Sequence, residues 1–397
     1  MDEKIGLGAR IREFRERLGI QGQELALRVE LDPSAISNIE RGKRGVKSDE
    51  LAAIAKALGV SALALLEEDS LLGRLPVAPR ASSGTLVKGD VLARLTGLAE
   101  LHEVLAEFGI PARYLDLSPI DTSRWLATAP EAAALMMHKL DIEATGEDRF
   151  LALVRSIENT LGIDVLVEQR ETEGVLGASV TDPEFSLIFV NGNQQIARAL
   201  FTLAHELGHV IARDGRSLIL DDDLIARSDS ERFANAFAAA MLLPEDEVRK
   251  EIPRDDVPDA MTLCRLLDHW GTSFETLVYR LHNLRIINAA GRDRFRSLGL
   301  RGLVAQIDDE NLASRLMARV GLTPARHVPS LLAARASSGY RQGVISARPL
   351  AGLYGVDPDI VSATMELDAA ASLEEAVGSE GLDNCADADL YDGSPVD

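Results

Sequence analysis

The motif His205-Glu206-Leu207-Gly208-His209 combines residue types and a spacing that can bind a metal ion and break a bond. Two histidines four positions apart on a helix project from the same face, so their ring nitrogens can share one tetrahedral Zn²⁺. Glu206 follows the first histidine. A carboxylate there can take a proton from a water molecule that the metal activates and pass it to a leaving amine. The motif therefore predicts zinc-dependent hydrolysis of a peptide bond, with Glu206 as the catalytic residue.

A catalytic zinc needs a third protein ligand, and Glu231 is the carboxylate that the spacing favours. It begins an alanine-rich helix predicted at Glu231–Leu243, whose small side chains allow close packing on the histidine helix. Spacing alone leaves alternatives open. Ser228-x-x-Glu231 also fits a helix capping box, in which the serine and the glutamate bind backbone N–H groups. Four other carboxylates compete for the ligand position: Asp214, Asp222, Asp223 and Asp229.

The elements that carry these residues are predicted from hydrophobic periodicity and from turn residues. Gln194–Arg213 forms a helix that is apolar nearly all round, so its two histidines would be buried and would need a partner. Three β-type runs precede it, at Ile163–Glu168, Val175–Val180 and Ser186–Val190, separated by turn residues as in a meander. An acidic loop is expected at Asp221–Asp223. The predicted fold class is mainly α with a small β-sheet (α+β).

Residues 5–66 are predicted to form five short helices. The second and third, Gln23–Val29 and Pro33–Arg41, can form a helix-turn-helix, in which the later helix enters the major groove of DNA. Its N-terminal side chains then reach base edges, and nearby arginines and lysines bind phosphate. The residues expected at the DNA are Gln21, Gln23, Ser34, Ala35, Ser37, Asn38, Arg41, Lys43, Arg44 and Lys47. A bundle that binds a partner protein instead of DNA is the alternative.

Charge is unevenly distributed along the chain. The 397 residues carry a net charge of −21, but residues 1–66 hold 11 Lys and Arg against 10 Asp and Glu. A near-neutral segment with clustered arginines can dock on phosphate, while the acidic remainder lowers non-specific affinity for nucleic acid. Two cysteines exclude a disulfide framework, and the longest apolar run, near Ala236–Leu243, is far shorter than the ~20 residues of a membrane span. We therefore expect a cytoplasmic protein with no membrane partner.

Composition and motifs together predict five segments. A helix-turn-helix domain (1–68) and a linker without periodicity (69–88) precede a metallopeptidase domain (89–290), whose core lies at about 150–285. A helical C-terminal region (291–365) carries no motif that indicates a role. An acidic tail (366–397) follows, and its composition predicts disorder.

Both regions that carry chemistry resemble known families. The N-terminal helices are similar to the XRE (Cro/C1-type) helix-turn-helix family, and residues from about 150 to 285 resemble the ImmA/IrrE metallo-endopeptidase family. The first resemblance rests on Gly8–Arg12, Glu24–Ala26, Ile36–Gly42 and Leu51–Val60, and the second on Arg198–His209, Glu231–Ala239, Met241–Pro244 and Gly271–Leu281. Together the two resemblances cover roughly half of the chain.

The resemblance to the ImmA/IrrE family implies a ligand set and a substrate class. It implies that Glu231 is the third zinc ligand, beside His205 and His209. It also implies that the substrate is an XRE-type repressor, either a related protein or this chain itself across the 69–88 linker.

The resemblance to the XRE family implies a buried, structural ion pair between Arg10 and Glu40. DNA-binding domains of this type usually bind two half-sites as a dimer, so we expect a homodimer on a double-stranded DNA operator. One position departs from the family pattern. Gly22 stands between Gln21 and Gln23, where family members often carry a glutamine that contacts phosphate.

We therefore interpret the sequence as a DNA-binding transcriptional regulator with a zinc peptidase domain, which hydrolyses a repressor to switch gene expression in a stress or mobile-element response. The alternative is a non-catalytic transcription factor whose metal domain senses a ligand, a metal or a partner. Substitution of Glu206 by glutamine distinguishes the two, because it removes the general base and leaves the metal ligands in place.

Overall fold

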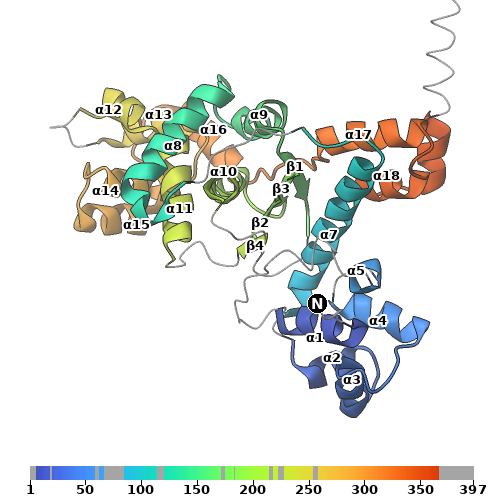
Figure 1. The fold of residues 1–397 in the computed structure, drawn as a ribbon. Helices are drawn as coiled ribbons and strands as arrows, with labels where there is room; N and C mark the ends of the chain where they lie inside the picture. The colour runs from blue at the N-terminus through green and yellow to red at the C-terminus, as the bar shows by residue number, and fades with distance from the viewer. Residues whose placement is uncertain are drawn as a thin grey trace, which may run out of the picture. The chain divides into compact units, whose positions relative to one another are not determined.

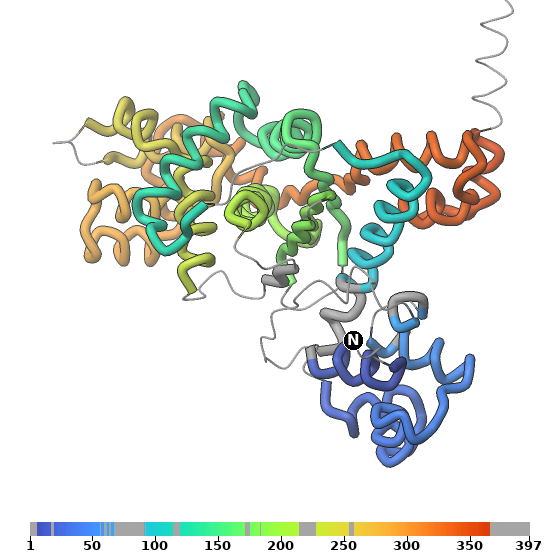
Figure 2. The backbone as a smooth tube through the Cα atoms, viewed as in Figure 1, coloured from blue at the N-terminus to red at the C-terminus, as the bar shows by residue number. Residues whose placement is uncertain are grey.

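The computed structural model describes residues 6–17, 20–58, 62–66, 85–113, 120–170, 175–182, 184–213, 218–221, 228–253 and 258–365 (Figure 2). The predicted acidic tail and residues 69–84 of the predicted linker lie outside the described residues. The chain divides into two compact units, 1–332 and 333–397, which are considered separately below. None of the helices in the described ranges is both long enough and apolar enough to cross a membrane.

Five helices form the N-terminal bundle: α1 (Leu7–Arg17), α2 (Gly22–Arg28), α3 (Pro33–Glu40), α4 (Ser48–Leu58) and α5 (Ala62–Leu66) (Figure 1). Asp32 is the N-cap residue of α3 and Pro33 takes its first position, where a missing N–H costs nothing. A Cβ atom on Gly8 would lie only 1.9 Å from the carbonyl oxygen of Ile39, so α1 and α3 pack in direct backbone contact. The helix-turn-helix prediction is confirmed.

Glu40 pairs with a different arginine from the one expected. Its carboxylate accepts hydrogen bonds from Arg15 Nε at 2.6 Å and Arg15 Nη2 at 3.0 Å, and both side chains are largely buried. Arg10 instead donates to the carbonyl oxygens of Leu65 and Leu66 at the end of α5. The predicted Arg10–Glu40 pair is therefore wrong. Both arginines lie on α1, and five residues of helix rotate them onto different faces.

A four-stranded sheet with the order β1-β3-β2-β4 lies at the centre of the region that was predicted to be a metallopeptidase domain. Its strands are β1 (Asp164–Glu168), β2 (Gly177–Thr181), β3 (Ser186–Asn191) and β4 (Leu218–Asp221). β1 runs parallel to β3, whereas β2 is antiparallel to β3 and to β4. The expected meander is wrong in strand order, and Asp221 ends a strand instead of beginning an acidic loop.

Four helices share a hydrophobic core with this sheet: α8 (Trp125–Leu140), α9 (Asp148–Ser156), α10 (Ile196–Ala212) and α11 (Asp229–Leu242). Short helical turns precede α8 (η1, Thr122–Arg124) and follow α9 (η2, Ile157–Leu161). α10 contacts β2 and β3 on one side and α11 on the other. A Cβ atom on Gly208 would lie 3.1 Å from both Ala234 Cα and Phe237 Cδ1, so α10 and α11 approach closely. The mainly helical α+β class is confirmed.

A second hydrophobic core follows along the chain. Its helices are α12 (Glu245–Glu251), α13 (Ala260–Trp270), α14 (Phe274–Asn283), α15 (Ala289–Val304) and α16 (Glu310–Arg319). Two further helices, α17 (Ser330–Arg341) and α18 (Ala347–Tyr354), and a helical segment at 358–365 complete the helical region expected at 291–365. The segment boundaries given above for the whole chain stay a prediction.

Two carboxylates of β1 hold segments that are distant in sequence. Helix α7 (Thr85–Glu107) is bound through Arg94, whose Nη2 lies 2.7 Å from Glu168 Oε1, and through His102, whose Nε2 lies 3.1 Å from Asp164 Oδ2. The other oxygen of Asp164 accepts a hydrogen bond of 3.0 Å from the backbone N–H of Leu332. The carboxylates of one strand thus bind side chains of α7, which precedes it, and a backbone N–H of a segment that follows it by more than 160 residues.

Candidate metal centre

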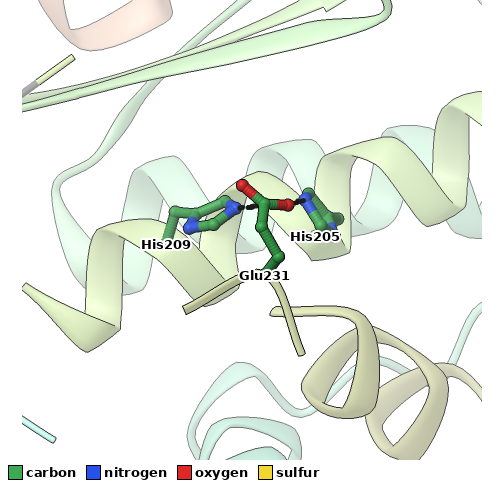
Figure 3. A group of neighbouring side chains, drawn as sticks. All are labelled: His205, His209 and Glu231. Atoms are coloured by element: carbon green, nitrogen blue, oxygen red, sulfur yellow. Dashed lines mark hydrogen bonds and ion pairs between the residues drawn. The ribbon is translucent and has the colours of Figure 1, made fainter. Parts of the chain in front are cut away.

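Two imidazoles and one carboxylate meet between α10 and α11 (Figure 3). His205 and His209 lie one turn apart on α10, and their Nε2 atoms are 3.1 Å apart. Glu231 enters from the first turn of α11, and its Oε2 lies 3.6 Å from His205 Nε2 and 3.8 Å from His209 Nε2. All three side chains are buried. The structure therefore brings together the three residues that were predicted as metal ligands.

This donor set fits one metal ion. The three ligand atoms all lie within 4.8 Å of one another. Around a tetrahedral Zn²⁺ with bonds of about 2.0–2.1 Å, neighbouring ligand atoms are separated by about 3.3–3.4 Å, close to the distances observed between these atoms. Two imidazoles and a carboxylate are also a ligand combination that zinc hydrolases use. Burial of the carboxylate beside two imidazoles is costly unless a cation or shared protons compensate its charge.

The capping alternative for Glu231 holds for its backbone and not for its side chain. Ser228 is the N-cap residue of α11, and its hydroxyl oxygen accepts a hydrogen bond of 3.3 Å from the Glu231 backbone N–H. The Glu231 carboxylate lies against the imidazoles instead. Among the competing carboxylates, Asp229 is exposed and pairs with Arg232. The other three competing carboxylates, Asp214, Asp222 and Asp223, lie outside the described residues.

Sequence reasoning missed the residue that contacts the second histidine. Ser230 is buried, and its Oγ lies 3.3 Å from His209 Nδ1. A contact on the far ring nitrogen fixes the orientation of the imidazole, so that its other nitrogen points toward a metal. The only signal in the sequence is that this serine directly precedes Glu231.

Glu206 is completely buried on α10, where β2 passes directly against it. A Cβ atom on Gly177, the first residue of β2, would lie 2.6 Å from Glu206 Oε1. The adjoining backbone is fixed by Gln194, which donates to the Leu176 carbonyl at 2.8 Å and accepts from the Thr202 hydroxyl at 2.9 Å. The sheet and α10 thus fix the wall beside this carboxylate.

Comparison with known proteins identifies both regions. Residues 158–282 match the family model of the IrrE N-terminal-like domain, and residues 11–65 match that of the helix-turn-helix. The chain joins a helix-turn-helix domain to an IrrE N-terminal-like domain. The Radiation response metalloprotease IrrE of Deinococcus radiodurans is 32% identical over 111 residues, which are 25% of this chain and 32% of that protein. The match thus spans about a third of the length of that relative.

Two solved structures match this chain over most of their length, but their structural similarity is weak. ComR from S. thermophilus, in complex with DNA and its signalling peptide ComS, is 14% identical, with a TM-score of 0.18 and coverage of 79% of this chain and 98% of that chain. PlcR from Bacillus thuringiensis, in complex with the peptide PapR7 and DNA, is 12% identical, with a TM-score of 0.16 and coverage of 94% and 99%. TM-scores this low establish no shared arrangement and hence no shared function.

The helix-turn-helix domain exposes most of the side chains that were predicted to contact DNA. Gln21, Gln23, Ser34, Arg41, Lys43 and Lys47 are exposed, and Ala35, Ser37, Asn38 and Arg44 are partly exposed. Arg44 Nη2 lies 2.6 Å from Glu50 Oε1, and Arg41 donates to the Ser37 hydroxyl, so these three polar side chains already have partners inside the domain. Their contacts with DNA stay a prediction.

Substitution of Gly177 by alanine tests how tightly the IrrE N-terminal-like domain holds Glu206. The new methyl group would meet Glu206 Oε1 and Thr202 Cγ2, each at 2.6 Å, inside a buried strand. We expect a loss of about 1–3 kcal/mol in the free energy of unfolding, measured by urea denaturation. Gly97→Ala is the control, because a Cβ atom there meets nothing within 4 Å on helix α7. Equal stability of the two variants would contradict the prediction.

Proposed function

We propose that this chain is a DNA-binding transcriptional regulator of the cytoplasm whose IrrE N-terminal-like domain is a zinc peptidase. It hydrolyses a peptide bond in an XRE-type repressor, either a partner protein or this chain itself across the 69–88 linker, and thereby switches gene expression. The observation that carries the proposal is the buried group of His205, His209 and Glu231, with Glu206 on the same helix as the two histidines.

Each residue of the site has a distinct task. His205, His209 and Glu231 hold the zinc ion, and Ser230 orients the His209 ring through Nδ1. When bound, zinc supplies Lewis acidity that polarises a water molecule and the scissile carbonyl group. The Glu206 carboxylate accepts the proton from water during attack and then donates it to the nitrogen of the leaving amine.

The DNA-binding half works through α2 and α3. In this proposal Ser34, Ala35 and Asn38 face base edges, and Arg41, Lys43, Arg44 and Lys47 bind the backbone phosphates. Gln21, Gln23 and Ser37 also contact the DNA. Arg10 and Glu40 act structurally through the separate contacts described above. A homodimer places two such helices on the two half-sites of a double-stranded operator.

Metal-dependent fragmentation tests the peptidase. Purified full-length protein is stripped with a chelator, and one portion is reloaded with one equivalent of zinc. Each portion is incubated alone and with XRE-type repressors from the same cell, and intact masses are recorded. We expect pairs of fragments whose masses sum to the substrate plus one water, in the zinc-loaded portion only. Intact substrates in every zinc-loaded reaction would contradict the proposal, as would equal cleavage in the chelated portion.

A further inference from the structure

A cavity of about 1130 Å³ lies between the two hydrophobic cores of the metallopeptidase region. Its walls come from α10 and α11 on one side and from α14, α15 and α16 on the other. Cavities of about 300–1,000 Å³ are typical of ligand sites, and such sites occur preferentially where two packed bodies meet. The proposed hydrolysis uses none of the side chains that line this cavity, so the chemistry at the metal centre does not account for it.

The cavity begins beside the metal centre. Phe201 lines it, and the ring of Phe201 lies 6.3 Å, centroid to centroid, from the ring of His205 one turn further along α10. Leu176 also lines the cavity and directly precedes Gly177, the residue that abuts the Glu206 carboxylate. A chain segment held at the metal centre can therefore extend into the cavity from its reacting peptide group.

The interior of the cavity suits a large apolar group. Sizeable apolar side chains line it while remaining partly exposed, among them Trp125, Phe201, Phe274, Leu298, Leu300 and Met317. Gly299 lies among them with φ 66° and ψ 171°, a conformation that only glycine adopts readily, and it kinks α15 where Leu298 and Leu300 reach the cavity. Burying a Phe or Leu side chain in such a site contributes about 1.5–3 kcal/mol.

The charged side chains around the cavity favour an acidic occupant. Four arginines line it against one acidic residue: Arg198, Arg232, Arg301 and Arg319 against Glu275. Arg232 and Arg319 pair with Asp229 and Asp268. Within the described residues, no carboxylate lies at ion-pair distance from Arg198 or Arg301, and both side chains are exposed. This local excess of positive charge occurs in a chain whose net charge is −21.

We propose that the cavity binds a bulky apolar side chain of an acidic peptide, and that this contact selects which bond is cut. The claim that this contact selects the bond to be cut rests on the peptidase function proposed above. The claim that the cavity binds a peptide rests on the cavity alone. The apolar side chain fills the space between Phe201 and the kink of α15, and neighbouring carboxylates of the peptide pair with Arg198 and Arg301. A peptide is favoured over a free amphiphile because the cavity continues from the site where a peptide bond would lie.

Binding to the full-length Glu206→Gln protein, loaded with zinc, tests this proposal without cleavage of the probe. The probes are fluorescein-labelled decapeptides that differ at one central position (Phe, Trp, Leu or Ala) and in flanking residues (Glu, Gln or Lys). We expect the Phe and Trp peptides flanked by Glu to bind about 10-fold or more tightly than the Ala peptides. Arg301→Glu should weaken the Glu-flanked peptides about 10-fold and leave the Gln-flanked ones unchanged. Arg294→Glu, exposed on the same helix and absent from the cavity wall, should change neither.

The outcomes separate this proposal from the peptidase proposal. Equal affinity for Phe and Ala peptides would overturn the cavity assignment, even if wild-type protein cleaves them all. The expected preferences without any cleavage by the wild-type protein would support the cavity and contradict the peptidase. Binding of dodecanoate with no binding of any peptide would also overturn the proposal, because it would identify a site for free amphiphiles.

Discussion

Substitution of Glu231 by alanine should remove the metal from the protein while leaving the fold of the domain in place. The carboxylate supplies one of three ligand atoms, and its Oε2 lies 3.6 and 3.8 Å from the two imidazole nitrogens. Changes to residues that only orient ligands cost about 10–100-fold in metal affinity, so we expect a loss of at least about 100-fold here. Zinc content of purified protein and competition with a chromophoric chelator would measure it.

The matched control lies two residues away. Asp229 is in the same first turn of α11, is exposed and pairs only with Arg232 among the partners described for it, so Asp229→Ala should keep its zinc. The helix start also survives Glu231→Ala, because Ser228 binds the backbone N–H of that residue and not its side chain. Helical content by circular dichroism should therefore match that of wild type. One equivalent of tightly held zinc in the Glu231→Ala protein would remove the carboxylate from the proposed ligand set.

Substitution of Glu206 by glutamine should strongly lower the rate of hydrolysis and retain the metal. Glutamine has nearly the same shape as glutamate, so it fits the buried space beside Gly177, but it cannot accept a proton from water. General-base catalysis contributes about 10²–10⁴-fold, which is the expected fall in cleavage rate. Fragment formation followed by intact mass would measure it, and zinc content equal to wild type is the control.

The same variant decides between a peptidase and a sensor. A regulator that acts by proteolysis should lose its control of a reporter gene when Glu206 becomes glutamine. A domain that only senses a ligand, a metal or a partner should keep that control, because its metal ligands are untouched. If the Glu206→Gln protein cleaved its substrate at the wild-type rate, another group would have to serve as the base.

Local signals in the sequence predicted the helices that carry the site. The two-histidine spacing predicted α10, and the alanine-rich run that follows predicted α11. The Asp32-Pro33 pair predicted the start of α3. Helix α8 was missed, and it contains Pro130, a residue type that ordinarily marks a helix end. An uninterrupted periodic pattern predicts a helix from one segment alone. A helix that contains a proline depends on packing against other parts of the molecule, which its own segment does not show.

The strand order, the ion-pair partner of Glu40 and the cavity could not be predicted from the sequence, for a physical reason. Nearly every described residue of β1, β2 and β3 is buried, so the strands show no alternation of polar and apolar residues that could set their order. The choice of Arg15 over Arg10 as the partner of Glu40 depends on helix rotation within the bundle. The cavity was invisible for the same reason, since its wall runs from Trp125 to Val320.

The contacts of β1 determine which cuts can set the DNA-binding domain free. Arg94 and His102 hold α7 on Glu168 and Asp164, so α7 stays with the sheet even when the chain is nicked at any bond between α7 and β1. Such a nick yields two polypeptides that still migrate as one particle in a native gel and separate only in denaturant. A cut between Leu66 and the start of α7 breaks the covalent tether on the side of the helix-turn-helix. If the chain cleaves itself as proposed, a cut in that stretch is the one that we expect to release the helix-turn-helix domain.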